Sequence, residues 1–230
     1  MIKNSKTALI YRIASLFIAI LGLLTMMGIF ENRFHTRSLM YYTIQSNILG
    51  IILFTMLSIR TLREVHKPSQ GNASFFPRFE MVCVLNLLLT LVVYWLLLFP
   101  VHFKAVGDTG VRSFGNLAVH GFTPLLCLLD YILFTRPRHL KYHDIFYVCI
   151  FPISYLIITS TAGLFGYVYS ISSIDGLPVR FPYFFFDFDR IGLLSLVYIG
   201  LIVVFFLILG HIIYFIDKKI RSENKTGNHP

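Results

Sequence analysis

The stretch RIGLLSLVYIGLIVVFFLILGHIIYFI, from Arg190 to Ile216, decides the class of fold. A bilayer core about 30 Å thick is crossed by roughly 20 apolar residues in a helix, and this stretch is long enough. The whole chain has the same character: 56% of its 230 residues are hydrophobic, 13% are charged, and the mean hydropathy is +0.72. Soluble domains average about 45–50% apolar and about 25% charged residues. We therefore expect an integral membrane protein.

Six segments have the length and composition of a membrane span: residues 9–30, 39–59, 80–101, 113–134, 144–170 and 190–216. Each must be helical, because an open strand would leave backbone groups without hydrogen bonds in lipid. In the fifth segment, Pro152 is expected to bend the helix or to mark its start. The predicted fold is an all-α bundle of six transmembrane helices. It forms one domain over residues 1–217, followed by a cytoplasmic tail without fixed structure over residues 218–230.

The basic residues indicate how the spans are oriented. The formal net charge is +9, but Lys and Arg lie at the ends of spans, where topology and anionic lipid explain them without a nucleic-acid partner. The larger share lies on one side, in the N-terminus, the loops at 60–78 and 136–141, and the tail. Both termini are therefore predicted to be cytoplasmic. Residues 3–30 resemble a signal peptide, but their apolar part is too long, so an uncleaved first span is expected.

The cysteines and the known sequence motifs give no sign of a metal or an organic cofactor. Cys83, Cys127 and Cys149 lie in apolar runs without CxxC or Cys/His spacing, so we expect buried thiols rather than disulfides or a zinc site. The chain has no GxSxG, no HExxH and no Gly-rich phosphate loop. No cofactor is expected.

Polar residues inside two of the expected spans are the most informative feature of the chain. In YYTIQSNIL, residues 41–49, Thr43, Ser46 and Asn47 are spaced with Gly50 at i, i+3, i+4 and i+7, and so share one helix face. In lipid, such side chains are costly and usually face the bundle interior or a cavity. At 1.5 Å per residue, Thr43 is expected roughly 8 Å below the outer end of the span.

The fourth span has a second polar face, formed by Asn116, His120, Thr123 and Cys127. This span runs in the same direction as the second, and His120 is expected roughly 12 Å deep by the same arithmetic. A hydroxyl and an imidazole are thus predicted at similar depth in two parallel helices, where Thr43 and His120 can meet.

Two interpretations fit such a pair. The first is interhelical hydrogen bonding, because Ser, Thr, Asn, Gln and His commonly join membrane helices. The second is nucleophilic catalysis, in which His120 takes the proton of Thr43 as the hydroxyl attacks an ester carbonyl. Asn47, Ser46 or Asn116 would then orient the imidazole or stabilise the oxyanion, where one donor is worth roughly 3–4 kcal/mol.

Acidic residues also lie near the ends of the fourth and sixth spans. In YFFFDFDR, residues 183–190, Asp189 and Arg190 are expected to form an exposed ion pair at a helix start. Asp187 is expected either to hold this segment over a cavity or to pair with an imidazole. Asp130, at the inner end of the fourth span, is expected to be hydrated or to pair with the two arginines that follow it.

The chain resembles the androgen-induced protein family, which includes the androgen-dependent TFPI-regulating protein and many six-span prokaryotic proteins. YYTIQSNIL resembles the second-span signature of the prokaryotic members, and NLAVHGFTPLLCLLDYILF, residues 116–134, resembles their fourth span. FPYFFFDFDRIG, residues 181–192, resembles the aromatic, Asp-containing entry to their last span. The resemblance covers about residues 8 to 216.

Animal members of this family are intramembrane threonine hydrolases that cleave fatty acid esters of hydroxy fatty acids. The resemblance therefore implies that Thr43 is a nucleophile, that His120 is its base, and that the substrate is a long-chain acyl ester. Because YYTIQSNIL follows the prokaryotic pattern, we expect a fatty acid ester of a hydroxy fatty acid or a similar lipid ester as the substrate. The resemblance also implies a bacterial plasma membrane, with membrane lipids as partners.

Two other functions remain open on the sequence. In a lipid-binding or small-molecule-binding membrane protein or transporter, Thr43, Asn47 and His120 would bind a head group, and Thr43→Ser would be tolerated. In a structural or regulatory membrane protein, the polar pairs would only fix helix packing, and Thr43→Ala would lower thermal stability without removing an activity. A hydrolase predicts a Thr43→Ala variant that is folded and inactive.

Overall fold

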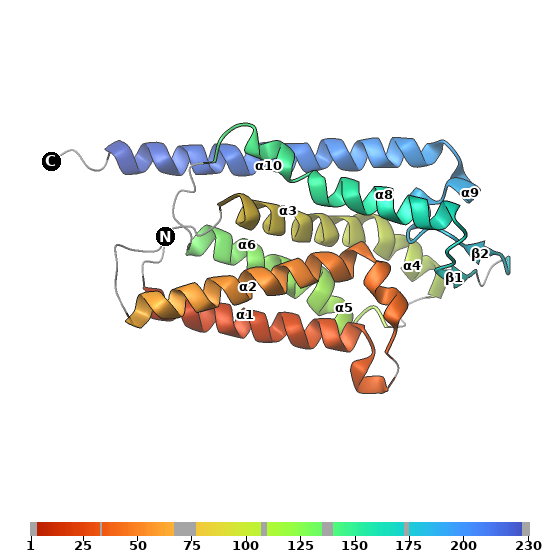
Figure 1. Cartoon of the computed structure of the whole chain (residues 1–230), viewed down its shortest axis with the longest axis horizontal. Helices are drawn as coiled ribbons and strands as arrows, with labels where there is room; N and C mark the ends of the chain where they lie inside the picture. The colour runs from red at the N-terminus through yellow and green to blue at the C-terminus, as the bar shows by residue number, and fades with distance from the viewer. Residues whose placement is uncertain are drawn as a thin grey trace.

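The computed structural model describes residues 4–32, 34–66, 77–106, 110–134, 140–172 and 175–226. These residues form long helices that run side by side along the long axis of the molecule, as Figure 1 shows. The helices are α1 (Ser5–Met26), α2 (Tyr42–His66), α3 (Pro77–Val93), α4 (Phe99–Val106), α5 (Phe114–Leu117), α6 (Thr123–Leu133), α7 (Asp144–Tyr147), α8 (Ile150–Leu164), α9 (Phe188–Ile191) and α10 (Leu194–Thr226). Two π-helical turns, η3 (Tyr94–Leu98) and η4 (Ala118–Phe122), join α3 to α4 and α5 to α6.

Shorter elements connect the helices at one end of the bundle. They are the 3-10 turns η1 (Ile29–Glu31), η2 (Thr36–Met40) and η5 (Phe184–Phe186), and the antiparallel strands β1 (Ser170–Ile171) and β2 (Pro178–Val179). In Figure 1, α1 begins and α10 ends at the opposite end of the bundle. The start of α2 therefore lies near β1, β2 and α9, away from the ends of the chain.

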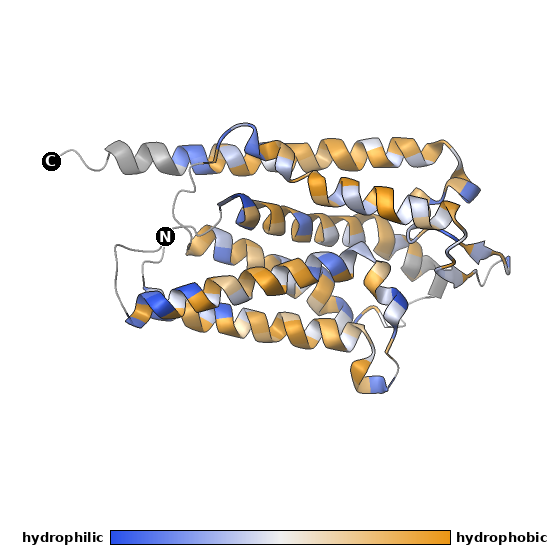
Figure 2. Ribbon diagram, in the orientation of Figure 1, coloured by the Kyte–Doolittle hydropathy of each residue, from blue (hydrophilic) through white to orange (hydrophobic). Residues whose placement is uncertain are grey.

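Within the described residues, five helical stretches are long and apolar enough to cross a membrane: Ser5–Met26, Pro77–Val101, Phe114–Leu133, Asp144–Leu164 and Leu194–Lys219. The chain thus has an all-α fold of the membrane type. The helix that corresponds to the second predicted span, α2, is not among these five stretches. Its first turns hold the polar face of Thr43, Ser46 and Asn47, and its last turns hold charged residues. Figure 2 shows this contrast, with hydrophilic residues on α2 and a largely hydrophobic α10.

The helices of the fifth and sixth predicted spans, α8 and α10, differ in extent from the prediction. α8 ends at Leu164 rather than at 170, because Gly166 takes a positive φ of 88° that ends the helix. Pro152 lies in the first turn of α8, where the missing N–H of proline costs no hydrogen bond, so it marks the start of the helix. α10 continues to Thr226, through most of the tail that was expected to lack fixed structure.

Small residues bring α1 close to the turn that holds His120. A Cβ atom on Gly22 would lie 2.2 Å from Cβ of Ala118, the first residue of η4. A Cβ atom on Gly115 would lie 2.8 Å from the backbone nitrogen of Met26. Both contacts need glycine, as is common where membrane helices approach closely. The α1 helix therefore fixes the position of η4.

A buried ion pair joins the helices at the other end of the bundle. Arg12 Nε lies 2.8 Å from Asp130 Oδ1, and its Nη2 lies 3.2 Å from Oδ2. The same guanidinium donates to the hydroxyl of Thr61. Asp130 is thus paired with an arginine of the first helix, whereas the two arginines expected to pair with it lie outside the described residues. Residues of α1, α2 and α6 meet at this point.

Ion pairs also hold the segment between α8 and α10. Arg180 pairs with Asp189, and Arg190 lies 3.2 Å from Asp175. The expected pair between Asp189 and Arg190 is therefore replaced by pairs that tie α9 to the β1–β2 hairpin, and Arg190 Nε also lies 3.6 Å from Oδ2 of Asp187. The hydrogen bond from Arg180 holds the pKa of the Asp189 carboxyl below its usual value.

Candidate active site

Thr43 and His120, from α2 and η4, are in direct contact. Thr43 is the second residue of α2, and its Oγ1 lies 3.2 Å from Nε2 of His120. Both side chains are buried, with exposed fractions of 8% and 4%. The contact joins two helices that the sequence predicted to present polar faces at similar depth.

The second ring nitrogen of His120 fixes which tautomer faces Thr43. Nδ1 lies 3.1 Å from the backbone oxygen of Asn116, one turn earlier. Because a carbonyl oxygen can only accept, Nδ1 must bear the proton. In the neutral imidazole, Nε2 then has a free lone pair and accepts the hydroxyl proton of Thr43. This arrangement suits a general base that acts on a hydroxyl nucleophile.

His120 lies in the middle of a π-helical turn, a feature often found at functional sites. A second π turn, η3, lies against it and supplies two aromatic neighbours. Tyr94 stacks on the imidazole with ring centroids 3.7 Å apart, and Trp95 Nε1 donates to the backbone oxygen of His120 at 3.0 Å. The imidazole is therefore held on one face and through its backbone.

The side chain of Asn116 supports this arrangement indirectly. Its amide nitrogen donates to the hydroxyl of Tyr94 at 2.6 Å and to the backbone oxygen of Val111 at 2.8 Å. Both amide donors are therefore engaged away from Thr43. Asn116 orients the imidazole through its backbone carbonyl, and its side chain fixes the tyrosine on which the imidazole lies.

Asn47 and Ser46 also have their donors engaged with protein acceptors. The amide nitrogen of Asn47 donates to the backbone oxygens of Thr43 at 2.8 Å and Val119 at 3.0 Å. The hydroxyl of Ser46 lies 3.0 Å from the same Thr43 oxygen and 2.7 Å from Oγ1 of Thr90. Neither side chain is therefore positioned as an oxyanion donor in this arrangement. Asn47 instead ties the turn of Thr43 to the residue that precedes His120.

Asp187 caps a helix in the segment that lies over Thr43. Its Oδ1 accepts the backbone N–H groups of Asp189 and Arg190 at 3.1 and 3.2 Å, and it starts α9. It does not line either of the cavities that Thr43 lines. Of its two expected roles, the contacts fit the first, in which it holds the segment in place.

Tyr183, from the same segment, reaches the site and was not among the predicted site residues. It lines both cavities beside Thr43, and its ring lies parallel to that of Phe185 with centroids 5.2 Å apart. Burial raises the pKa of Tyr183 to about 12, against the opposing effect of hydrogen bonding with Thr43. The phenol therefore stays protonated and can donate. The one sequence signal for it was the aromatic run before Asp187.

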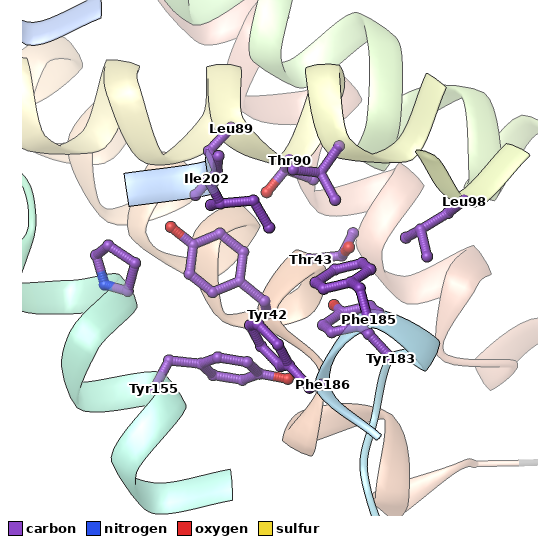
Figure 3. A pocket seen from close by; sticks show the side chains of 12 residues that line it. Tyr42, Thr43, Leu89, Thr90, Leu98, Tyr155, Tyr183, Phe185, Phe186 and Ile202 are labelled. Carbon is purple, nitrogen blue, oxygen red and sulfur yellow. The ribbon is translucent and has the colours of Figure 1, made fainter. Parts of the chain in front are cut away.

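Two cavities meet at Thr43. The first, which we call the inner cavity, has about 450 Å³ of empty space, part of it open to solvent, and is shown in Figure 3. Its lining comes from α2, α3, η3, α8, α10 and the segment around η5: Tyr42, Thr43, Leu89, Thr90, Val93, Leu98, Pro152, Tyr155, Tyr183, Phe185, Phe186 and Ile202.

The second, which we call the outer cavity, has about 930 Å³ of empty space, part of it open to solvent. Its lining is Met26, Ser38, Tyr41, Thr43, Ile44, Tyr94, Leu98, Gly110, Val111, Ser113, Asn116, His120 and Tyr183. Thr43, Leu98 and Tyr183 belong to both cavities, whereas His120 lines only the outer one.

The fold and the site together define a helical membrane-type bundle with a buried Thr–His pair between two cavities. Comparison of the chain with protein-family models, with curated proteins and with solved structures gave no match. The resemblance to the androgen-induced protein family therefore stays a sequence-based prediction.

Proposed function

We propose that this chain is an intramembrane hydrolase of long-chain acyl esters, with Thr43 as nucleophile and His120 as general base and then acid. The observation that carries the proposal is the 3.2 Å contact between Thr43 Oγ1 and His120 Nε2. It is supported by the bond from Nδ1 to the backbone of Asn116, which leaves Nε2 as the acceptor. A hydroxyl with a base at hydrogen-bond distance is the recurring form of an activated nucleophile.

The reaction proceeds in two balanced halves. Oγ1 of Thr43 bonds to the acyl carbon while its proton passes to Nε2 of His120. The bond between the acyl carbon and the alcohol oxygen then breaks, and His120 returns the proton to the leaving alcohol. Water attacks the acyl-threonine with loss of a proton to His120, the bond to Oγ1 breaks, and Oγ1 takes that proton back. The products are an alcohol and a carboxylic acid, and no redox partner is consumed.

Tyr183 is our candidate for the donor that stabilises the oxyanion. Its side chain lines both cavities beside Thr43, and its pKa of about 12 keeps it protonated at neutral pH. Thr43 itself lies in the first turn of α2, where the partial positive charge of a helix N-terminus favours developing negative charge. The amide side chains of Asn47 and Asn116 would act by positioning Thr43 and His120.

We further infer that α2 is a sixth membrane span beside the five apolar stretches. Its 25 residues extend about 37 Å at 1.5 Å per residue, which is enough to cross a bilayer core of about 30 Å. The excess of basic residues at the ends of α2 and α10 favours a cytoplasmic location for both termini. The Thr–His pair would then lie near the outer leaflet of a bacterial plasma membrane, with membrane lipids and an acyl ester as partners.

The test is covalent labelling of the detergent-purified protein with a fluorophosphonate, located by peptide mass spectrometry. We expect an adduct on Thr43 in the wild type and none in Thr43→Ala or His120→Ala. The matched control is Thr55→Ala, on the same helix, because the hydroxyl of Thr55 donates to Ile51 of its own helix and should not affect labelling. Thermal unfolding of each variant shows that it is folded.

Two results would overturn the proposal. One is a folded wild type that gives no adduct while a control hydrolase in the same detergent is labelled. The other is labelling that persists in Thr43→Ala. Either result would favour a protein that binds lipid without chemistry.

A further inference from the structure

The position of His120 relative to the two cavities determines which way an ester lies in the site. In the proposed reaction, His120 must give its proton to the alcohol oxygen and later accept a proton from water. His120 lines the outer cavity and does not line the inner one. The alcohol oxygen and the attacking water must therefore both be on the side of the outer cavity, and the acyl chain must leave the carbonyl in the other direction.

The chemistry of the inner cavity fits an aliphatic chain. Most of its lining side chains are apolar, and its polar ones are engaged with the protein. The hydroxyl of Tyr155 donates to the backbone oxygen of Met40 at 3.0 Å, and that of Tyr42 donates to Asn86 Oδ1. Thr90 donates to the backbone oxygen of Asn86 at 3.2 Å and bonds Ser46. Away from Thr43 and Tyr183, the wall thus offers hydrophobic contact to an occupant.

The outer cavity has more polar groups on its wall, although most of that wall is apolar too. These groups are the ring edge of His120, the hydroxyl side chains of Ser38 and Ser113, and backbone from Gly110 to Val111. The outer cavity is also the larger of the two, and both are partly open to solvent. Such a space suits a polar or amphiphilic alcohol and admits the water that completes the reaction.

We propose that the two cavities divide the substrate at its carbonyl, so that the acyl chain fills the inner cavity and the alcohol part occupies the outer cavity. The substrate class is then an ester of an aliphatic acid, whose chain lies between α3, α8 and α10, with a polar or amphiphilic alcohol that points outward. The acyl-chain length is limited by Leu89, Val93 and Ile202, and Thr43 lies at the junction. This proposal depends on the proposed hydrolase function.

The test is the acyl-length profile of the full chain in detergent, measured with p-nitrophenyl esters and alkyl fluorophosphonates of increasing chain length. The variants Val93→Phe and Ile202→Phe, from two different helices, each narrow the inner cavity. We expect either one to lower kcat/KM and labelling rate for the longest chains by about tenfold or more, because methylene-sized changes in an apolar pocket discriminate by that amount. For short acyl chains, kcat/KM and the labelling rate of each variant should stay within about threefold of the wild-type values.

Matched controls lie beside each variant on the outward face of the same helical stretch. Leu96 and Leu201 are 69% and 63% exposed, so Leu96→Phe and Leu201→Phe add the same ring outside the cavity. Both should keep the wild-type profile. Met26→Phe, which narrows only the outer cavity, should change the preference for the alcohol part and leave the acyl-length profile unchanged.

The possible failures can be told apart. A folded wild type that neither hydrolyses any ester nor labels on Thr43 overturns the hydrolase and this proposal together. An active wild type whose length profile is the same in Val93→Phe and Ile202→Phe overturns the division of the substrate alone. A length profile that shifts in Met26→Phe instead would reverse the assignment of the cavities. Should one narrowing variant fail to fold, the other decides.

Discussion

The imidazole of His120 lies on the phenol ring of Tyr94, with ring centroids 3.7 Å apart and an angle of 15° between the ring planes. The stack leaves the ring edge free, with Nδ1 toward the backbone of Asn116 and Nε2 toward Thr43. The hydroxyl of Tyr94 in turn accepts from the side chain of Asn116. Tyr94 thus fixes the plane of the imidazole. Asn116, which fixes the tautomer of the imidazole, also holds Tyr94 in place.

Two substitutions of Tyr94 separate its ring from its hydroxyl. Tyr94→Phe keeps the ring, and we expect its rate of fluorophosphonate labelling to stay within about threefold of the wild type, since Asn116 keeps its bond to Val111. Tyr94→Leu removes the stack, worth about 0.5–1.5 kcal/mol, and should slow labelling by up to about tenfold. Equal rates in Tyr94→Leu and wild type would show that the stack does not position the base.

Asn47 connects the two halves of the site, and Asn47→Leu should disturb both. The substitution removes the donor to the buried backbone oxygens of Thr43 and Val119. Ser46 still donates to the Thr43 oxygen, but each lost hydrogen bond costs about 0.5–1.5 kcal/mol, so we expect a lower midpoint of thermal unfolding together with slower labelling of Thr43. Gln45→Leu is the control, because its amide donates to the backbone oxygen of Leu39 in η2, in an exposed contact. Similar midpoints for both variants would contradict a positioning role for Asn47.

Hydropathy and helix-face spacing predicted much of this structure, for physical reasons. An apolar run of about 20 residues has few alternatives to a helix in lipid, so the elements were predictable from composition. The i, i+3, i+4 spacing and the similar depth predicted that Thr43 and His120 lie near each other. Helical geometry is sufficient for this prediction, because it varies little.

The residues and turns that hold Thr43 and His120 in place could not be predicted in the same way. The π turns at 94–98 and 118–122 change the register of two helices by local backbone geometry that no residue type specifies. Tyr94 and Tyr183 looked like two more aromatic residues in an apolar chain. Asn47 was assigned to the right face, but its role depends on which acceptors its donors meet, and that is a property of the packed structure.

Substitution of Gly22 tests whether the close approach of α1 positions η4, the turn that holds His120. A methyl group at this position would lie 2.2 Å from Cβ of Ala118, so Gly22→Ala must push α1 away from η4. We expect a loss of thermal stability of about 1–3 kcal/mol and slower labelling of Thr43, as in other overpacked contacts. Gly200→Ala, in α10, meets nothing within 4 Å and should be neutral or slightly stabilising. Normal labelling of folded Gly22→Ala would show that the site tolerates movement of α1.

Substitution of Asp187 tests whether its hydrogen bonds to the start of α9 order the segment over Thr43. Asp187→Ala loses the acceptor for the backbone N–H groups of Asp189 and Arg190, whereas Asp187→Asn keeps an oxygen there. Loss of a helix cap lowers stability by about 0.5–2 kcal/mol, and here the loss should affect only the segment around α9. We expect faster limited proteolysis between 183 and 190 in Asp187→Ala than in Asp187→Asn, which keeps the cap and loses only the ion pair with Arg190. Equal cleavage of the two variants would contradict the capping role.

The pair of Arg12 and Asp130 should behave as a buried ion pair that fixes helix packing away from the candidate active site. Arg12 and Asp130 are 6% and 2% exposed, and two of their atom pairs lie 2.8 and 3.2 Å apart. Removing one partner leaves an uncompensated buried charge, so Arg12→Leu and Asp130→Leu should each lower stability by about 3–5 kcal/mol. The double variant should recover much of that loss, because neither charge then remains. Thermal unfolding in one detergent measures all three variants, and a double variant as unstable as the sum of the singles would show that the two residues do not act as a pair.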